Sequence, residues 1–279
     1  MLGGVVLLVA LAGVACDEPI VRGEPQRIVA LAPSVTETLF VLGLGDRVVG
    51  VGDYSVWPPE VAGKPKLGGL FDVSLEGIMA LEPDLAILLR SEDKLRGQLE
   101  RLGVEVLTVE SDTIADIIET TRRIGEKAGV SEAAEDFVRQ FEIDLMPRRI
   151  GGAPSVVITM GRRPRNFSDI LVAGPGTYLH ELLVRLGAFN AFADSPISYP
   201  QVGLEEILGR RPDAILELQP SPGSIAWLKQ DWAAFPEQQL AGTGCVQVVA
   251  GDHVLVPGPR LPRIYWELRR ALFDCVQSR

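Results

Sequence analysis

Short apolar runs alternate along the chain with segments of helical periodicity. Residues 27–31 (RIVAL) form a continuous apolar run stopped by Ala-Pro, which is typical of a buried parallel strand. Ser34 and Glu37 have the spacing of a capping box, so Ser34 is expected to cap a helix that ends at Gly43 or Gly45. The same alternation predicts strands over 48–51, 85–89 and 104–109 and helices over 74–81 and 95–102. The first half therefore has the pattern of an α/β layer.

Two helix-period segments, 112–127 and 131–149, follow this layer. In the second, one apolar stripe runs along the helix through Ala134, Phe137, Val138, Phe141 and Leu145. After Pro154 the alternation starts again, with strands expected over 156–159, 214–217 and 246–249 and helices over 177–186, 204–208, 225–240 and 261–276. The chain thus repeats its α/β pattern on both sides of a helical middle.

An internal repeat links the two halves. Residues 74–84 match residues 203–213, with Leu, Glu, Ile, Pro and Asp at the same spacing, and Glu37 to Gly43 matches Glu181 to Gly187 upstream. A helix-Pro-Asp-strand junction can recur by chance, but two stretches in the same order favour a duplication. Two similar lobes leave a cleft between them, where ligands bind at the carboxyl ends of the strands.

Composition narrows the function further. The 279 residues suggest about two domains at ~150 residues each. With 37 Asp+Glu against 27 Lys+Arg, the formal net charge is −10, and the longest Lys/Arg cluster is a pair. A duplex nucleic-acid binder needs a basic footprint, so we expect no nucleic-acid partner. With 23% charged residues and abundant Val, Leu and Ile, the chain is expected to fold.

The first fifteen residues carry no charge and lead directly into Cys16. This run is too short to span a bilayer, and it predicts a signal peptide (1–16) whose lipobox, Gly13 to Cys16, directs lipidation of Cys16. Residues 17–26 then form a tether. No Lys or Arg precedes the run, and lipoboxes usually have Leu where Gly13 stands; a buried N-terminal element is the alternative. In an oxidising compartment Cys245 and Cys275 could form a disulfide or remain buried thiols.

Catalytic motifs are absent from the sequence. It has no HExxH, GxSxG, P-loop or CxxC, and its two histidines, His180 and His253, are not at ligand spacing. We therefore expect no catalytic residue and no metal site. The enzyme alternative is a metal-assisted hydrolase or a chelatase-like protein that uses the cleft, but its candidate acids, Asp53, Asp72 and Asp169, are scattered along the chain.

Five segments carry a family resemblance: 27–37 (RIVALAPSVTE), 49–58 (VGVGDYSVWP), 75–85 (LEGIMALEPDL), 199–202 (YPQV) and 257–260 (PGPR). They resemble periplasmic substrate-binding proteins of the vitamin B12 and iron-siderophore ABC importers, with the cobalamin-binding branch closest, over nearly the whole chain after the signal. The resemblance implies an α/β fold of two Rossmann-like lobes with central, mainly parallel sheets. A single long α-helix (131–150) would join an N-terminal lobe (27–130) to a C-terminal lobe (151–279).

The resemblance also implies a function. A monomeric, non-enzymatic receptor, without cofactor and lipid-anchored in the periplasm or at the cell surface, would capture a corrinoid and deliver it to an ABC permease dimer with its ATPase. The expected ligand-binding residues are Ser34, Tyr54, Trp57, Leu70, Phe71, Arg90, Phe167 and Tyr199. Glu76 and Glu205, one per lobe, would dock onto permease arginines; the simpler alternative is that each only stabilises its helix N-terminus.

Departures from the branch leave the ligand open. Leu70 or Phe71, and Leu89, stand where cobalamin-binding relatives have tryptophans, and Leu186 replaces one cysteine of their disulfide. Haem is one alternative, with Tyr54 or His253 as the axial iron ligand. A ferric siderophore is another, bound by a basic loop with Arg162, Arg163 and Arg165; loop arginines are also commonly just solvated. Aromatic side chains such as Trp57 and Phe71 could likewise fix loops onto their lobe.

Overall fold

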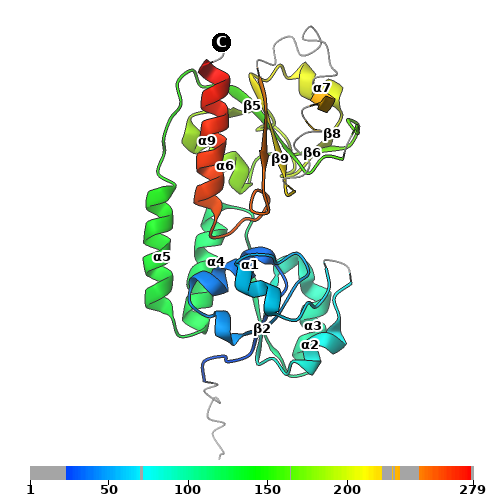
Figure 1. Cartoon of the computed structure of the whole chain (residues 1–279), viewed down its shortest axis with the longest axis vertical. Coiled ribbons are helices and arrows are strands. Elements are labelled where there is room, and N and C mark those ends of the chain that lie inside the picture. The colour runs from blue at the N-terminus through cyan, green and yellow to red at the C-terminus, as the bar shows by residue number, and fades with distance from the viewer. Residues whose placement is uncertain are drawn as a thin grey trace, which may run out of the picture.

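The protein consists of two α/β lobes, one above the other in Figure 1, each built around one sheet. The computed structural model describes residues 23–69, 72–163, 165–221, 228, 230–232 and 245–277. The expected signal peptide with Cys16, most of the expected helix 225–240, and Leu70 and Phe71 lie outside these residues. At the end of the expected tether, Gln26 is already fixed to the N-terminal lobe, because its backbone N–H donates to Asp84.

The N-terminal sheet has four parallel strands in the order β2-β1-β3-β4. They are β1 (Ile28–Ala30), β2 (Val48–Val51), β3 (Leu85–Leu89) and β4 (Glu105–Val109). The α-helices α1 (Pro33–Val41), α2 (Leu75–Ala80) and α3 (Asp93–Arg101) and the 3-10 helices η1 (Gly45–Arg47), η2 (Pro59–Gly63) and η3 (Arg90–Glu92) connect them. Every residue of β1 is fully buried, which explains its uninterrupted apolar sequence.

The C-terminal sheet repeats this order and extends it. Its strands are β5 (Ser155–Met160), β6 (Ile170–Val172), β7 (Phe189–Asn190), β8 (Gln201–Val202), β9 (Ala214–Gln219) and β10 (Cys245–Ala250). The helices α6 (Tyr178–Leu186), α7 (Leu204–Gly209) and α9 (Leu261–Gln277) belong to this lobe. Parallel pairing in the order β7-β5-β9-β10 matches β2-β1-β3-β4, while β6 and β8 add an antiparallel extension.

Matching contacts confirm the duplication. The Asp84 carboxylate accepts the backbone N–H of Arg27 at the start of β1 (3.0 Å), and Asp213 accepts that of Ser155 at the start of β5 (2.7 Å). Each aspartate therefore ties the strand that follows it to the first strand of its own lobe. The repeated Pro-Asp pair follows α2 and α7, and its aspartate provides this link in both sheets.

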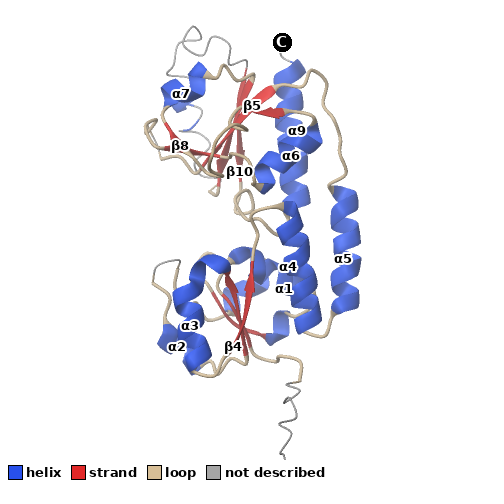
Figure 2. Cartoon of the chain, turned by 180° about the vertical axis from the view of Figure 1, so that it is seen from behind, coloured by secondary structure: helices blue, strands red, loops and turns tan. Residues whose placement is uncertain are grey.

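A pair of helices runs along both lobes. They are α4 (Ile114–Lys127) and α5 (Ser131–Asp144). The two run antiparallel beside each other along the molecule (Figures 1 and 2). Ile117 of α4 and Phe141 of α5 belong to the core of the C-terminal lobe, whereas Ile124 of α4 and Ala134 of α5 belong to that of the N-terminal lobe. The chain passes from the N-terminal to the C-terminal lobe through α5, as expected, and α4 packs beside it as a second helix that contributes to both cores.

The connecting helix α5 is shorter than expected. It ends at Asp144 rather than at 150, because Pro147 lacks a backbone N–H and disfavours helical geometry in the residue before it. Leu145 remains buried, and the backbone N–H of Arg148 donates to the Tyr265 hydroxyl of α9 (2.9 Å). The chain beyond α5 is thus held against the C-terminal lobe before it enters β5.

The start of the first helix differs from the expected capping box. Pro33 occupies the first helical turn and Ala32 is the cap residue, so Ser34 lies inside α1 and does not cap it. The Ser34 carbonyl accepts the Thr38 hydroxyl (2.9 Å). Glu37 is therefore not a capping-box partner, and its carboxylate is used elsewhere.

Cys245 at the start of β10 and Cys275 in α9 form a disulfide, with a Cα–Cα distance of 5.4 Å. The bond ties the last helix to the edge strand of the C-terminal sheet. Within the described part of the chain, no helix combines the length and apolar character needed to cross a bilayer.

Candidate functional site

The segments that follow two of the N-terminal strands, β1 and β4, meet the C-terminal lobe. Ser34, after β1, lies against Gly258, where a Cβ atom would come within 3.2 Å of the Ser34 Cα. After β4, the Asp112 carbonyl accepts the backbone N–H of Tyr178 (2.7 Å). The carboxyl ends of this sheet therefore face the other lobe, as expected for a binding cleft in an α/β protein.

An ion pair joins the lobes at this junction. Arg260, just before α9, donates from Nε to Glu37 Oε2 (3.0 Å) and from Nη2 to Glu37 Oε1 (2.5 Å). Its Nη1 donates to Asp252 (2.7 Å), and its guanidinium lies 5.0 Å from the centroid of the Trp57 ring. Burial raises the pKa of Glu37 above its ordinary value, against the opposing effect of Arg260. Trp57, one of the expected ligand residues, is half-buried beside this pair.

Among the described aromatic residues expected in the cleft, Tyr54 is the most exposed, with 70% of its surface accessible. It follows β2 and borders a small pocket of about 70 Å³. The other side chains that line this pocket are Leu31, Ala32, Pro33, Leu89 and Glu92. An apolar recess with one polar group is the usual character of a small-molecule subsite.

Glu92 was not among the expected site residues. Its Oε2 accepts the backbone N–H of Leu89 at the end of β3 (2.7 Å), and burial raises its pKa. The signal that could have found it is a glutamate three residues after an apolar strand, in position to return to the backbone there.

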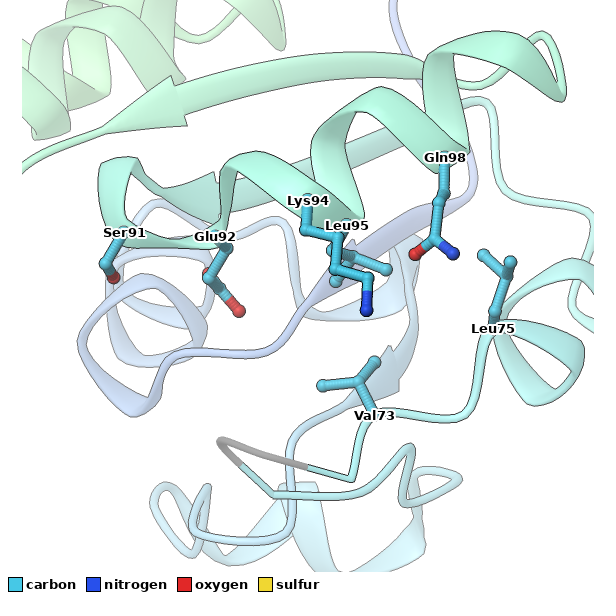
Figure 3. Close-up of a pocket in the computed structure, with 7 residues that line it drawn as sticks. All are labelled: Val73, Leu75, Ser91, Glu92, Lys94, Leu95 and Gln98. Atoms are coloured by element: carbon cyan, nitrogen blue, oxygen red, sulfur yellow. The ribbon is translucent and has the colours of Figure 1, made fainter.

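A second pocket, of about 400 Å³, lies between α2 and α3 (Figure 3). The pocket is lined by residues of η3, α3, the start of α2 and the loop before it: Val73, Leu75, Ser91, Glu92, Lys94, Leu95 and Gln98. Glu92 lines both this pocket and the one beside Tyr54. The two recesses are therefore neighbours at the carboxyl end of β3.

Arg90 lies at the same end of the sheet. Its side chain is exposed and forms an ion pair with Glu110, which follows β4. An arginine paired in this way is partly neutralised, so it offers less attraction to an anionic ligand than a free arginine would.

The loop that carries Arg162, Arg163 and Arg165 has one buried and two exposed arginines. Arg162 is buried and donates to Glu217 (2.9 Å) and Asp231 (2.9 Å), while Arg163 and Arg165 are exposed. The Arg162 guanidinium lies 4.2 Å from the centroid of the Phe167 ring. A basic siderophore-binding loop is therefore not supported at Arg162, whose charge is balanced inside the lobe.

Two expected cleft residues of this lobe lie in different surroundings. Phe167 packs edge-on against Trp232, with ring centroids 5.3 Å apart, within an apolar cluster of the lobe. Tyr199 is half-buried; burial, together with the nearby charge of Asp112, raises its pKa to about 12. Asp112 belongs to the N-terminal lobe, where it follows β4, so its proximity places Tyr199 at the junction of the lobes. Phe167 instead packs inside the C-terminal lobe.

The histidines and aspartates do not assemble a reactive site. His253 is fully buried and its Nε2 lies 2.7 Å from Glu267 of α9, so it is not placed as an open axial ligand for haem iron. His180 lies in α6, close to Asn190 (3.3 Å). Asp53 and Asp72 accept backbone N–H groups of Gly68 and Gly69. Among the residues that the structure describes, no group of His, Cys, Asp and Glu side chains could hold a metal ion.

Comparison with known families identifies the protein family to which this two-lobed chain belongs. The family model described as "Periplasmic binding protein" matches residues 28–227, which is more than half of the chain. The chain belongs to the periplasmic binding protein family. Periplasmic binding proteins are exported transport components and not enzymes, so this chain is a binding protein and the enzyme alternative falls away.

Relatives and solved structures support this placement. The chain is 30% identical to the vitamin B12-binding protein of Pectobacterium carotovorum over 85% of this chain and 84% of the relative. It is 30% identical to the uncharacterized ABC transporter substrate-binding lipoprotein YvrC of Bacillus subtilis, over 91% and 82%. The vitamin B12-binding protein BtuF of Vibrio cholerae has a TM-score of 0.72 at 26% identity, over 91% of this chain and 99% of that one.

The haem-binding protein RhuT of Roseiflexus, in its apo form, has a TM-score of 0.77 at 25% identity, over 90% of this periplasmic binding protein and 99% of that chain. Both solved structures thus match nearly their full length, and the expected two-lobed α/β fold is confirmed.

Proposed function

We propose that this periplasmic binding protein captures cobalamin, or a closely related corrinoid, in the cleft between its lobes and delivers it to a membrane permease. It acts as the substrate-binding component of an ABC importer. The observation that carries the corrinoid assignment is the similarity to vitamin B12-binding proteins, which reaches 30–32% identity over 80% or more of this chain in two relatives.

The proposed cleft surface suits a large, neutral, partly apolar ligand. Tyr54 exposes its ring at the end of β2, and the adjoining recess is formed mainly by Leu31, Pro33 and Leu89. An aromatic ring covers a flat ligand face at low entropic cost. Arg90 is paired with Glu110 and Arg162 is buried with Glu217, so these arginines are poorly placed to attract an anionic ligand.

Ligand capture would involve only small movements of the lobes. Both α4 and α5 are anchored in the cores of both lobes, and the Glu37–Arg260 pair adds a cross-link near the cleft. A preorganised site loses little conformational entropy on binding. The binding free energy then comes mainly from the apolar ligand surface buried between the lobes.

Delivery would use one glutamate from each lobe. Glu76 and Glu205 occupy the same position in the first turns of α2 and α7, and both side chains are exposed. Within the described part of the chain, no ion pair involves either carboxylate. Two equivalent carboxylates on a two-lobed body match a two-fold permease dimer that presents arginines.

A lipid anchor on Cys16 would keep the receptor beside its permease and ATPase. The apolar N-terminal run before Cys16 supports this proposal, and the Bacillus subtilis relative is named a lipoprotein.

Haem is the second candidate ligand. The apo haem-binding protein of Roseiflexus has the same fold over nearly all of its chain, and the exposed phenol of Tyr54 is available as an iron ligand. Titrating the purified protein with cyanocobalamin and, in parallel, with hemin separates the two candidates. If hemin is the ligand, Tyr54→Phe abolishes the shift of its Soret band; if cobalamin is, hemin produces no such shift.

A further inference from the structure

Among the described residues that line the pocket beside Tyr54, one, Glu92, carries a carboxylate. The other described side chains on its walls are apolar or aromatic. Among the described side chains that line the pocket, that of Glu92 is the carboxylate, and it therefore sets the charge of the pocket. A ligand group entering here meets one negative charge in otherwise apolar surroundings.

The carboxylate is held in a fixed position. Its Oε2 accepts the backbone N–H of Leu89 (2.7 Å) at the end of β3, which orients the side chain between the two pockets. Among the described residues, no hydrogen-bond donor reaches Oε1. The side chain is only half-buried, so this oxygen can accept a hydrogen bond from a bound molecule.

Among the described residues, no cation forms an ion pair with Glu92. Arg90 forms its ion pair with Glu110, and Lys94 lines only the larger pocket between α2 and α3. An ionised carboxyl group accepts hydrogen bonds but donates none. It therefore favours an amide or ammonium group and opposes a second carboxylate, because juxtaposed like charges weaken binding strongly.

We infer that Glu92 is a specificity-determining residue that accepts a hydrogen bond from a primary amide of the ligand and rejects ligands that present a carboxylate at the same place. This inference rests on the proposed function and refines it. A corrinoid carries primary amides around its ring, whereas haem carries two propionate carboxylates. Glu92 would thus separate two flat macrocycles of similar size by the charge of their side arms.

The direct test compares cyanocobalamin with its three monocarboxylic derivatives, in each of which one peripheral propionamide is hydrolysed. Affinities are measured calorimetrically at neutral pH for the unmodified protein, Glu92→Gln and Asp93→Asn. Glutamine keeps an oxygen that can accept the Leu89 N–H. Asp93→Asn removes an equal charge one residue away, from a side chain that lines neither pocket and pairs with Arg96.

The unmodified protein and Asp93→Asn are expected to bind at least one monoacid at least about tenfold more weakly than cyanocobalamin. A tenfold difference in affinity corresponds to about 1.4 kcal/mol of binding free energy. Glu92→Gln should reduce that ratio to below about threefold. The inference is overturned if Glu92→Gln keeps the same ratio of cyanocobalamin to monoacid affinity as the unmodified protein. It is also overturned if the unmodified protein binds cyanocobalamin and all three monoacids equally well. Circular dichroism of each variant shows that it is folded.

A hemin titration of the same proteins separates this inference from the proposed function. If the unmodified protein does not bind cyanocobalamin, the proposed corrinoid function is wrong, and the role of Glu92 is decided with hemin alone. Tighter hemin binding by Glu92→Gln than by Asp93→Asn supports the repulsion of carboxylates, and equal or weaker binding overturns it. If neither ligand binds, both proposals are overturned.

Discussion

Glu37 and Arg260, 223 residues apart in the sequence, form an ion pair with two hydrogen bonds across the junction of the lobes. Both side chains are almost completely buried, at 2% and 9% exposure. Asp252 pairs with the same guanidinium, so the hydrogen bonds that Arg260 donates to two carboxylates raise its pKa although burial opposes the shift. The arginine therefore stays charged, and its removal would leave Glu37 buried without its cation.

Arg260→Ala is expected to lower the free energy of unfolding by about 3–5 kcal/mol, since breaking a buried pair leaves an uncompensated charge. Denaturant unfolding at neutral pH measures this loss. The matched control is Arg263→Ala, which removes an exposed arginine paired with Glu267 (3.0 Å) and should cost at most about 1 kcal/mol. Equal losses in the two variants would contradict the structural role of Arg260.

The loss in Arg260→Ala should also depend on pH. Burial already raises the pKa of Glu37, and without Arg260 that pKa rises further. A carboxyl whose pKa is raised in the folded state contributes most stability below its unfolded pKa, and this contribution is lost as the pH rises through the folded value. The difference between Arg260→Ala and the unmodified protein should therefore shrink as the pH is lowered from 7 toward 4.5. A difference that is constant with pH would contradict this account.

The Cys245–Cys275 disulfide closes a loop of 30 residues between β10 and α9. Replacing both cysteines with serine should lower the free energy of unfolding by about 3–4 kcal/mol, through the larger entropy of the open unfolded chain. Dithiothreitol should destabilise the unmodified protein similarly and leave the double variant unchanged. A reductant effect of equal size in both proteins would show that the bond is not the cause.

Reversing the charge of both proposed docking residues, in Glu76→Lys with Glu205→Lys, should abolish uptake of the ligand while leaving its affinity unchanged. The two residues lie on α2 and α7, outside the pocket beside Tyr54, and would meet permease arginines with the wrong charge. The matched control is Glu206→Lys, which reverses the charge of the neighbouring exposed residue. The matching position of α2 is not a glutamate, so this variant should support normal uptake. Unimpaired uptake by the double variant would rule out this docking mode.

The preference for cyanocobalamin over its monoacids, proposed to depend on Glu92, should weaken at low pH. Burial raises its pKa above the ordinary 4.5, against the hydrogen bond from Leu89, so the side chain gains a proton before an exposed glutamate does. As the pH falls through this raised value, the ratio of cyanocobalamin to monoacid affinity should fall in the unmodified protein. In Glu92→Gln the ratio should change only with the ionisation of the ligand itself. Identical pH profiles for the two proteins would exclude the carboxyl as the titrating group.

Local sequence patterns predict most of the fold. The buried strands of both lobes are recognisable because each is a short apolar run bounded by a turn or a proline, and β3 has the predicted limits of 85–89. The Pro-Asp junctions after α2 and α7 identify the duplication, since Asp84 and Asp213 make the same link in both lobes. The short antiparallel strands β6 and β8 were missed because two or three residues carry too little periodicity.

Long-range partners could not be predicted in the same way. The stripe on α5 shows that the helix is buried on one face, but it does not show that α4 shares the connection or that both lobes contribute to the contact. Glu37 has capping-box spacing, yet its partner lies near the other end of the chain. Glu92 became recognisable only when folding placed it between two pockets.

The most direct test of the account is a titration of the purified protein with cyanocobalamin, followed calorimetrically, beside a hemin titration followed by absorbance. We predict saturable one-to-one binding of cyanocobalamin and no shift of the hemin Soret band. Binding of hemin alone, or of neither ligand, would contradict the corrinoid assignment while leaving the two-lobed periplasmic binding fold unchanged.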